Sequence, residues 1–200
     1  MNQPAPPRLQ TLTEVDAAVW RELGRAALDR HHEWRTPVLA SGHASGVDAR
    51  TVVLRETDRD ARCLAFYSDA RAAKVQQLLL DGQCMLVMWS ARLGWQLRLR
   101  ARAVVHTDGL AVSSRWTRLR LSPAARDYLA PQAPGTALDA DQEPPHAVAF
   151  APVQPAAPAT ERGHFALLQA HVEQIDWLEL HRDGHRRALF DSTGARWLVP

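Results

Sequence analysis

Two cations stand where the sequence predicts that a strand ends and a helix begins. After an apolar run, Tyr67-Ser68-Asp69 supplies a hydroxyl and a carboxylate, and Arg71 and Lys74 follow in the first helical turns. Free N–H groups and the macrodipole make a helix N-terminus attractive to anions, so cations there are unfavourable unless an anionic ligand is held. Lys74 is the only lysine among the 24 Lys and Arg residues. This favours an anion-binding turn over the alternative, a capped helix with solvated cations.

Two neighbouring strands carry further polar candidates. Arginines frame the apolar run Arg50-Thr51-Val52-Val53-Leu54-Arg55; the guanidinium fork suits a phosphate, but positions 50 and 55 of one regular strand point to opposite faces. Taken alone, the run is therefore interpreted as a core strand with two surface arginines. The segment from Gln96 to Ala103 alternates polar and apolar residues, which predicts a half-buried strand. The Gln96 amide could hydrogen-bond a heterocycle, while the arginines of this strand could simply face solvent.

The C-terminal segment from Trp177 to Arg187 brings an indole and several cations together across a tight turn at Asp183-Gly184. This dipeptide is a strong hairpin signal. Histidines in such a place, here including His185, are more often surface residues than catalytic ones.

In this order, the four segments resemble the pyridoxamine 5'-phosphate oxidase-like flavoproteins, whose fold is a split β-barrel that binds FMN at a homodimer interface. The resemblance runs from about Trp20 to Pro200. It implies that Arg50 and Lys74 clamp the FMN phosphate, that the backbone of 52–54 follows the isoalloxazine, and that Gln96 hydrogen-bonds the ring system. Trp177 and Arg187 would come from the partner subunit or close the site. The implied cofactor-binding residues are Arg50, Thr51, Val52, Val53, Leu54, Arg55, Tyr67, Ser68, Asp69, Arg71, Lys74, Gln96, Trp177 and Arg187.

The resemblance also implies a substrate site, with four departures from the family's oxidases. One is that the family's Tyr and Arg pair in the middle helix has at best Trp116 and Arg120 here. These oxidases carry Ser where Ala72 stands, Lys where Arg55 stands and Arg where Asp183 stands. A carboxylate at 183 would repel a substrate phosphate, so pyridoxamine 5'-phosphate is expected to be a poor substrate. No catalytic residue is assigned with certainty, and His185 is a candidate for substrate contact. The implied substrate-binding residues are Arg55, Trp116, Arg120 and His185.

The family's reaction passes a hydride from a substrate carbon to flavin N5, after which oxygen reoxidises the flavin. In such chemistry the cofactor reacts, while the protein orients the substrate and supplies charge for the phosphate. This agrees with a sequence that lacks a P-loop, a dinucleotide fingerprint, a nucleophilic triad or a metal-ligand pattern. The expected function is an FMN-dependent oxidase or reductase, a homodimer acting on a small molecule such as a phosphorylated pyridoxine-type compound. Two alternatives stay open: a flavin-binding protein without turnover, and a haem-handling split-barrel protein.

These segments need a scaffold of hairpins and short helices, and the sequence predicts a mostly β, antiparallel split barrel with flanking helices. A helix is expected from Thr13, as N-cap, to about His32; another opens at Asp69 and stops at Asp81-Gly82; a third stretch, 109–129, breaks at Ser122-Pro123. The expected strands are 37–41, 50–55, 63–68, 84–89, 95–105, 164–181, 186–191 and 196–199.

Length and composition constrain the number of domains, the location and the class of partner. The 200 residues favour a single domain, with a Pro-rich flap at about 131–160 that no stable helix or central strand can cross. No apolar run is long enough for a membrane span and no secretory signal is visible, so a cytoplasmic location is expected. The net charge of +2, from interleaved cations and anions, argues against nucleic acid. Cys63 and Cys84 are interpreted as reduced core residues.

Overall fold

The computed structural model describes residues 8–44, 46–138 and 162–200. In these ranges the helices are α1 (Leu12–Leu28), η1 (Glu33–Arg35), α2 (Ala73–Leu80), α3 (Gly109–Leu119) and η2 (Pro123–Tyr128). The strands are β1 (Val38–His43), β2 (Gly46–Thr51), β3 (Leu54–Asp58), β4 (Cys63–Asp69), β5 (Gln83–Ser90), β6 (Trp95–His106), β7 (Phe165–Glu179), β8 (Arg186–Asp191) and β9 (Gly194–Leu198). No helix in these ranges is long and apolar enough to cross a membrane.

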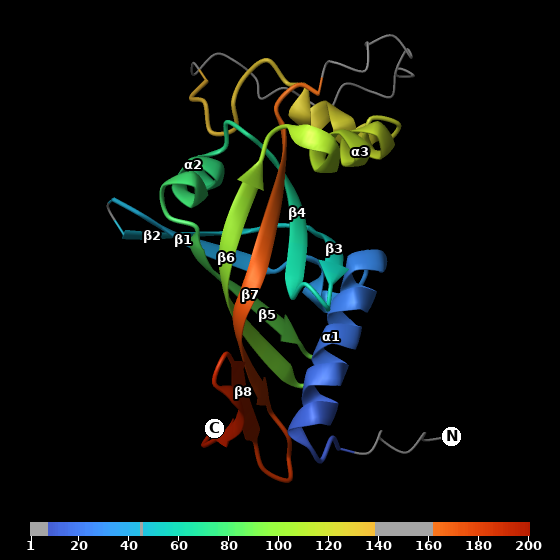
Figure 1. Ribbon diagram of the computed structural model, residues 1–200, viewed down its shortest axis with the longest axis vertical. Coiled ribbons are helices and arrows are strands. Elements are labelled where there is room, and N and C mark those ends of the chain that lie inside the picture. The colour runs from blue at the N-terminus through green and yellow to red at the C-terminus, as the bar shows by residue number, and fades with distance from the viewer. Residues whose placement is uncertain (1–7, 45, 139–161) are drawn as a thin grey trace.

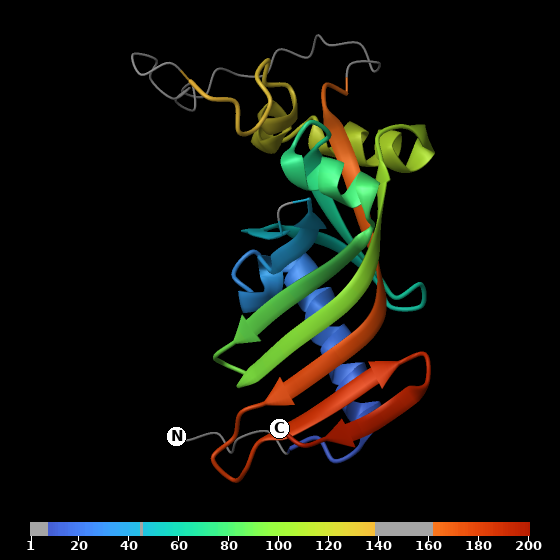
Figure 2. The same ribbon diagram turned by 90° about the vertical axis from the view of Figure 1, so that its left-hand side faces the viewer.

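All described strands belong to one antiparallel sheet. The strand order is β2-β1-β5-β6-β7-β4-β3, and β8 with β9 continues from β7. The first half of β7 pairs with β4 and its second half with β8, so the long β6–β7 pair runs the length of the molecule (Figure 1). Helix α1 lies against one face of this sheet (Figure 2).

The sheet curls without closing. Strands β2 and β3 are at opposite ends of the strand order, yet only Val52 and Val53 separate them in the chain. The two outer strands must therefore lie near each other, while no ladder between them is found in the described residues. This is the expected mostly β, antiparallel split barrel with flanking helices, and that prediction is confirmed.

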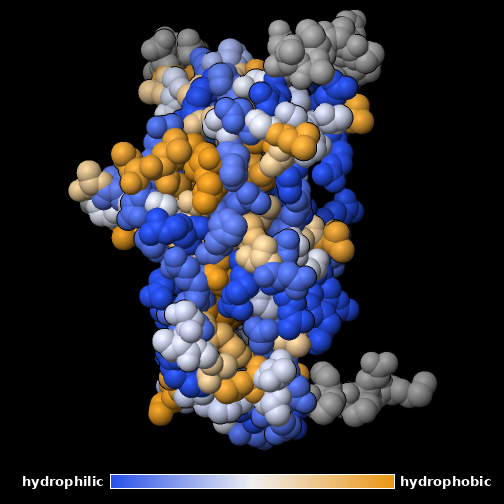
Figure 3. Space-filling view, in the orientation of Figure 1, coloured by the Kyte–Doolittle hydropathy of each residue, from blue (hydrophilic) through white to orange (hydrophobic). Residues whose placement is uncertain are grey.

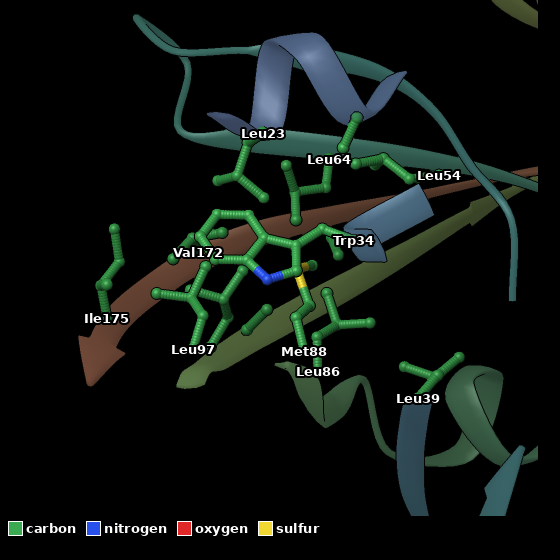
Figure 4. Packing of buried hydrophobic residues seen from close by; sticks show 14 of the residues in the cluster. Leu23, Trp34, Leu39, Leu54, Leu64, Leu86, Met88, Leu97, Val172 and Ile175 are labelled. Atoms are coloured by element: carbon green, nitrogen blue, oxygen red, sulfur yellow. The ribbon is translucent and has the colours of Figure 1, made fainter. Parts of the chain in front are cut away.

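The main core fills the space between the curled sheet and α1. Its centre is Trp34, which is fully buried and surrounded by aliphatic side chains from α1 and the sheet (Figure 4). Helix α1 begins with a capping box in which Thr11 accepts from the Glu14 N–H and Glu14 accepts from the Thr11 N–H. The predicted N-cap at Thr13 was therefore wrong by two residues, because the reciprocal partner of a capping box, Glu14, lies three residues after Thr11.

A second, smaller core lies under α3 and η2 at one end of the sheet (Figure 1). Its aromatic members are Trp116, Tyr128 and Phe165, whose ring centroids are 5.2–6.5 Å apart. The helix break predicted at Ser122-Pro123 is confirmed, since α3 ends at Leu119 and η2 begins at Pro123.

Two other element predictions were wrong. The run 50–55 is not one strand but the end of β2, a two-residue link and the start of β3. The helix expected to open at Asp69 begins at Ala73, because β4 continues through Asp69 and a turn follows. The hairpin at Asp183-Gly184 is confirmed: β7 pairs with β8 across it, and Gly184 adopts a φ of 100°. Of the predicted Pro-rich flap at 131–160, residues 139–160 lie outside the described ranges.

Candidate functional site

Arg50 is fixed at the end of β2 by three side chains and by the Leu39 carbonyl. Its guanidinium donates to the Ser41 hydroxyl at 2.7 Å and to the Gln77 amide oxygen at 2.8 Å, and it also pairs with Asp48. Ser41 and Gln77 are buried, and Ser41 in turn donates to Gln77 at 2.7 Å. This network joins β1, β2 and α2, so it sets the position of Arg50 relative to the start of α2.

Lys74, in the first turn of α2, lacks such partners in the described residues. It is half-buried, and no acceptor lies within hydrogen-bond or ion-pair distance of its ammonium in the described residues. Burial, and then the nearby Arg50 charge, lower the pKa of Lys74, and Asp69 opposes this only in part. Two cations are thus close together, and one of them, Lys74, is offset only in part by Asp69 and forms no ion pair in the described residues.

The start of α2 adds to this positive potential. Ala72 occupies the N-cap position, has no side-chain acceptor and is buried, so no side chain caps the first N–H groups of the helix. The positive end of the helix macrodipole further disfavours Lys74. An anion placed here would meet Lys74, Arg50 and free backbone N–H groups together.

Arg71, in the same turn, is already satisfied within the chain. Its guanidinium pairs with Asp69 at 2.7 Å and donates to the carbonyls of Ala130, Pro131 and Gln132 at 2.8–3.1 Å. Burial raises the pKa of Asp69, but hydrogen bonds from Arg71 outweigh it and hold that pKa below its ordinary value. Arg71 therefore ties the turn to the segment that follows η2. Ser68 is buried beside it, with its hydroxyl on the Asp69 carbonyl at 3.2 Å.

The strand break at Val52 and Val53 changes the geometry of the run 50–55. Leu54 is fully buried and Val52 nearly so, while Thr51 is exposed. The Val52 N–H donates to the Pro37 carbonyl at 3.0 Å. Since the run is not one strand, alternation does not force Arg50 and Arg55 to opposite faces.

Arg55 belongs to a second polar group, near Tyr67 and the smaller core. Its guanidinium lies 5.5 Å from the centroid of the Tyr67 ring, and its buried Nε has no acceptor in the described part of the chain. The Tyr67 hydroxyl donates to Glu56 at 2.8 Å, and Arg115 holds Glu56 through both carboxylate oxygens. Burial, and then Glu56, raise the pKa of Tyr67 to about 12.

Gln96, Trp177 and Arg187 are brought only partly together. Gln96 lies opposite Leu178, and Leu178 lies opposite Arg187, so Gln96 and Arg187 share the outer face of β6–β8. Trp177 points the other way and is fully buried in the main core. Arg187 forms a two-pronged pair with Asp176 at 2.7 and 2.9 Å.

The predicted substrate residues are spread over the molecule. Trp116 packs in the smaller core, and the buried Nε of Arg120 has no acceptor in the described ranges. His185 is exposed in the β7–β8 turn, where its Nδ1 accepts from the His181 N–H at 3.2 Å. In Figure 1 α3 and β8 lie at opposite ends of the long sheet, so one chain does not place His185 beside the other three.

Sequence reasoning missed the partners of two candidate residues. Arg50 is bound by Ser41, Asp48 and Gln77. Tyr67 is bound by Glu56, which Arg115 holds. One signal was available. Gln77 follows Lys74 by three positions, a spacing that puts both side chains on one helix face.

Comparisons with known proteins show what this chain is similar to. A family model described as pyridoxamine 5'-phosphate oxidase, FMN-binding domain, matches residues 17–107. These residues, fewer than half of the chain, are similar to that family's FMN-binding domain. The matched range contains Arg50, Lys74 and Gln96, but it ends before Trp177 and Arg187. No match was found among curated proteins.

This chain shares its fold with solved structures of pyridoxamine 5'-phosphate oxidase-related proteins. A related FMN-binding protein from Nostoc punctiforme aligns with a TM-score of 0.71 and 20% identity, over 96% of this chain and 100% of that one. PhzG from Burkholderia lata, solved with tetrahydrophenazine-1-carboxylic acid, aligns with a TM-score of 0.69 and 18% identity, over 92% and 91%. A protein related to general stress protein 26 from Clostridium acetobutylicum gives 0.53 and 8%, over 88% and 96%.

Proposed function

We propose that this chain binds FMN and works as an FMN-dependent oxidoreductase on a small anionic substrate. The observation that carries the proposal is Lys74, a half-buried ammonium without an acceptor in the described residues, beside Arg50 and the uncapped start of α2. A phosphate monoester fits this place because it offers two negative charges and several acceptor oxygens.

The residues of the chain divide the work of holding the cofactor. Arg50 and Lys74 would bind the phosphate, and the preset Arg50 network means that little ordering is needed on binding. The backbone at Val52 and Val53, which links β2 to β3 and belongs to no strand pairing in the described residues, would lie along the ring system, and Gln96 would offer its amide to ring polar atoms. When bound, FMN supplies a two-electron acceptor for a hydride from carbon.

Flavin content tests the binding proposal. Purified protein is expected to show flavin absorption bands and near-stoichiometric FMN after acid extraction. Lys74→Ala should lose FMN, whereas Gln76→Ala, an exposed neighbour on α2, should keep it. A protein that binds FMN and riboflavin equally well would refute the phosphate site, and a haem spectrum without flavin would favour the haem-handling alternative.

The substrate proposal rests on Arg55. Its buried Nε has no acceptor in the described ranges, and its guanidinium lies against Tyr67 and near Tyr128, an aromatic wall beside a positive charge. An aromatic molecule with a carboxylate or a phosphate suits such a place. Pyridoxamine 5'-phosphate has this chemistry, and so does the tetrahydrophenazine carboxylic acid bound by PhzG.

Turnover separates an oxidoreductase from a flavin-binding protein without activity. Holoprotein mixed anaerobically with pyridoxamine 5'-phosphate or a dihydroaromatic carboxylate should lose its flavin absorption near 450 nm. Admission of oxygen should restore it and release hydrogen peroxide. Arg55→Gln should raise KM for the anionic substrate while FMN content stays unchanged. Flavin that no member of either class reduces would leave FMN binding as the function.

We further propose that two copies of the chain form a homodimer through the outer face of the sheet. Val38 on β1, Val47 on β2 and Trp89 on β5 share this face with Gln96 and are 38%, 78% and 47% exposed. Figure 3 shows hydrophobic side chains gathered over α2 as well, where Leu79 and Leu80 are exposed. A self-complementary apolar face is what a two-fold dimer covers.

Mixing of variants tests whether the partner completes the site. Lys74→Ala and Arg187→Ala should each fail to hold FMN. Because the two residues lie at different places on one chain, we expect a single site to use Lys74 of one copy and Arg187 of the other. If each site takes Lys74 from one copy and Arg187 from the other, a refolded mixture regains about a quarter of the sites, because half of the dimers are mixed and each has one intact site. No recovery, or a monomer in sedimentation, would contradict the shared site.

We also propose that the protein is cytoplasmic. Cys63 and Cys84 are both buried and free of a disulfide, which suits a reducing compartment. Fractionation of the source cells tests this location, and recovery of the chain outside the cytoplasmic fraction would overturn it.

A further inference from the structure

A carboxylate, Asp48, binds the guanidinium that the proposed function assigns to a phosphate. Asp48 and Arg50 are two positions apart on β2, so their side chains leave the strand on the same face. Ser41 lies opposite Asp48 on β1, and Gln77 reaches both from α2. Side chains from three elements therefore meet around the Arg50 guanidinium.

The terminal N–H groups of Arg50 are all used within the chain. Nη1 donates to the Ser41 hydroxyl at 2.7 Å and to the Leu39 carbonyl at 3.4 Å. Nη2 donates to the Gln77 amide oxygen at 2.8 Å and to the Asp48 carboxylate. Each of these nitrogens carries two hydrogens. A phosphate can therefore bind the terminal donors only by replacing one of the four acceptors.

Asp48 is the acceptor that a phosphate replaces most readily. The Ser41 and Gln77 side chains are buried and bind each other at 2.7 Å, and the Leu39 carbonyl belongs to the backbone of β1. The Asp48 side chain is 44% exposed, so water can hydrate its carboxylate once it turns away from Arg50. Asp48 also carries the negative charge that makes it the closest chemical match to a phosphate.

Two donors converge on the same oxygen of Asp48. In addition to Arg50, the Gln77 amide nitrogen donates to Asp48 Oδ2 at 3.2 Å. The hydrogen bond from Gln77, and then the one from Arg50, hold the pKa of Asp48 below its ordinary value, so the carboxylate is ionised at neutral pH. A phosphate oxygen in the place of Oδ2 would gain both donors, while Ser41 and Gln77 keep Arg50 in position.

We propose that Asp48 is an internal competitor for the phosphate site, whose carboxylate holds Arg50 until a phosphate monoester takes its place. Lys74, which has no acceptor in the described residues, meets the phosphate without such an exchange. The affinity for phosphate then scales with the fraction of chains in which Asp48 has released Arg50. The inference rests on the proposed function for the phosphate site and adds a residue that sets its affinity.

Calorimetric titration of the full-length, flavin-free protein with FMN, and separately with inorganic phosphate, tests the competition. Asp48→Asn keeps the size of the side chain and an oxygen that accepts from Arg50 and Gln77, but it removes the negative charge. We expect both ligands to bind this variant about two- to fivefold more tightly than wild type, the effect of one partly exposed ion pair. Asp81→Asn, which removes an exposed carboxylate at the C-terminal end of α2, should leave both dissociation constants unchanged.

A crystal structure with inorganic phosphate distinguishes displacement of Asp48 from repulsion at a distance. A phosphate oxygen should lie within hydrogen-bond distance of Arg50 Nη2 and Gln77 Nε2, with Asp48 turned away from both. Unchanged or weaker binding by Asp48→Asn, an equal gain in Asp81→Asn, or phosphate bound while Asp48 still pairs with Arg50 would each overturn the inference. Binding of phosphate without FMN would refute the proposed cofactor alone. If Asp48→Asn binds neither ligand, the phosphate site and this inference are both wrong.

Discussion

Removal of the Lys74 charge should act in opposite directions on FMN binding and on the stability of the flavin-free protein. In Lys74→Gln the half-buried ammonium beside Arg50 disappears, and no described residue loses a partner. A charge-assisted hydrogen bond to phosphate contributes about 1.5–3 kcal/mol. The dissociation constant for FMN should therefore rise by about 10- to 150-fold, while riboflavin, which has no phosphate, should bind as before.

The second quantity affected is the stability of the flavin-free protein. Because the pKa of Lys74 in the folded chain lies below 10.5, the folded state releases this proton first as pH rises. Wild-type stability should thus improve, relative to Lys74→Gln, between that lowered pKa and the unfolded value of 10.5. Urea unfolding from pH 7 to 11 measures the difference, and calorimetric titration measures both flavins. The reasoning fails if Lys74→Gln binds FMN as tightly as wild type, or weakens riboflavin equally.

Three further outcomes are expected. Glu56→Gln should move the ultraviolet titration midpoint of Tyr67 below its value of about 12, since a neutral amide no longer opposes phenolate formation; an unmoved midpoint would show that burial alone sets it. Glu179→Gln should lower urea stability by about 1–3 kcal/mol, because its buried carboxylate accepts from Arg8 and Arg186. Burial raises the pKa of Glu179 but these bonds hold it below 4.5, so the wild-type advantage should vanish as pH falls through that lowered value; an advantage that persists at lower pH would contradict this assignment. Asp183→Arg should lower KM for pyridoxamine 5'-phosphate by up to about tenfold, since a charge pair in water contributes about 1 kcal/mol, and should leave FMN content unchanged; efficient turnover by the unmodified protein would refute the idea that Asp183 repels phosphate.

Local patterns predicted most of the strands. Strand β6 alternates polar and apolar residues, and β8 is bounded by a turn, so both were placed within a residue. The break at Val52 and Val53 was not predictable in this way. No glycine or proline marks it, and it arises because the barrel brings its two outer strands close together.

The relation between Trp177 and Arg187 shows a second limit of sequence spacing. They are ten positions apart, an even spacing that in one strand would place both side chains on one face. A turn lies between them, and the register of β7 with β8 sets Leu178, not Trp177, opposite Arg187. Only the register decides which face each side chain takes, and a local sequence pattern does not fix it.

The cations of the β4–α2 turn show what side-chain partners add to sequence. Arg71 and Lys74 have the same sign and almost the same place, and the spacing alone assigns both to an anion. In the folded chain Asp69 and three carbonyls use the donors of Arg71, whereas Lys74 has no acceptor in the described residues. A ligand phosphate would relieve an unfavourable charge at Lys74 but would have to compete with existing bonds at Arg71. We therefore expect Lys74 to bind the ligand at this turn, whereas Arg71 fixes the turn in place.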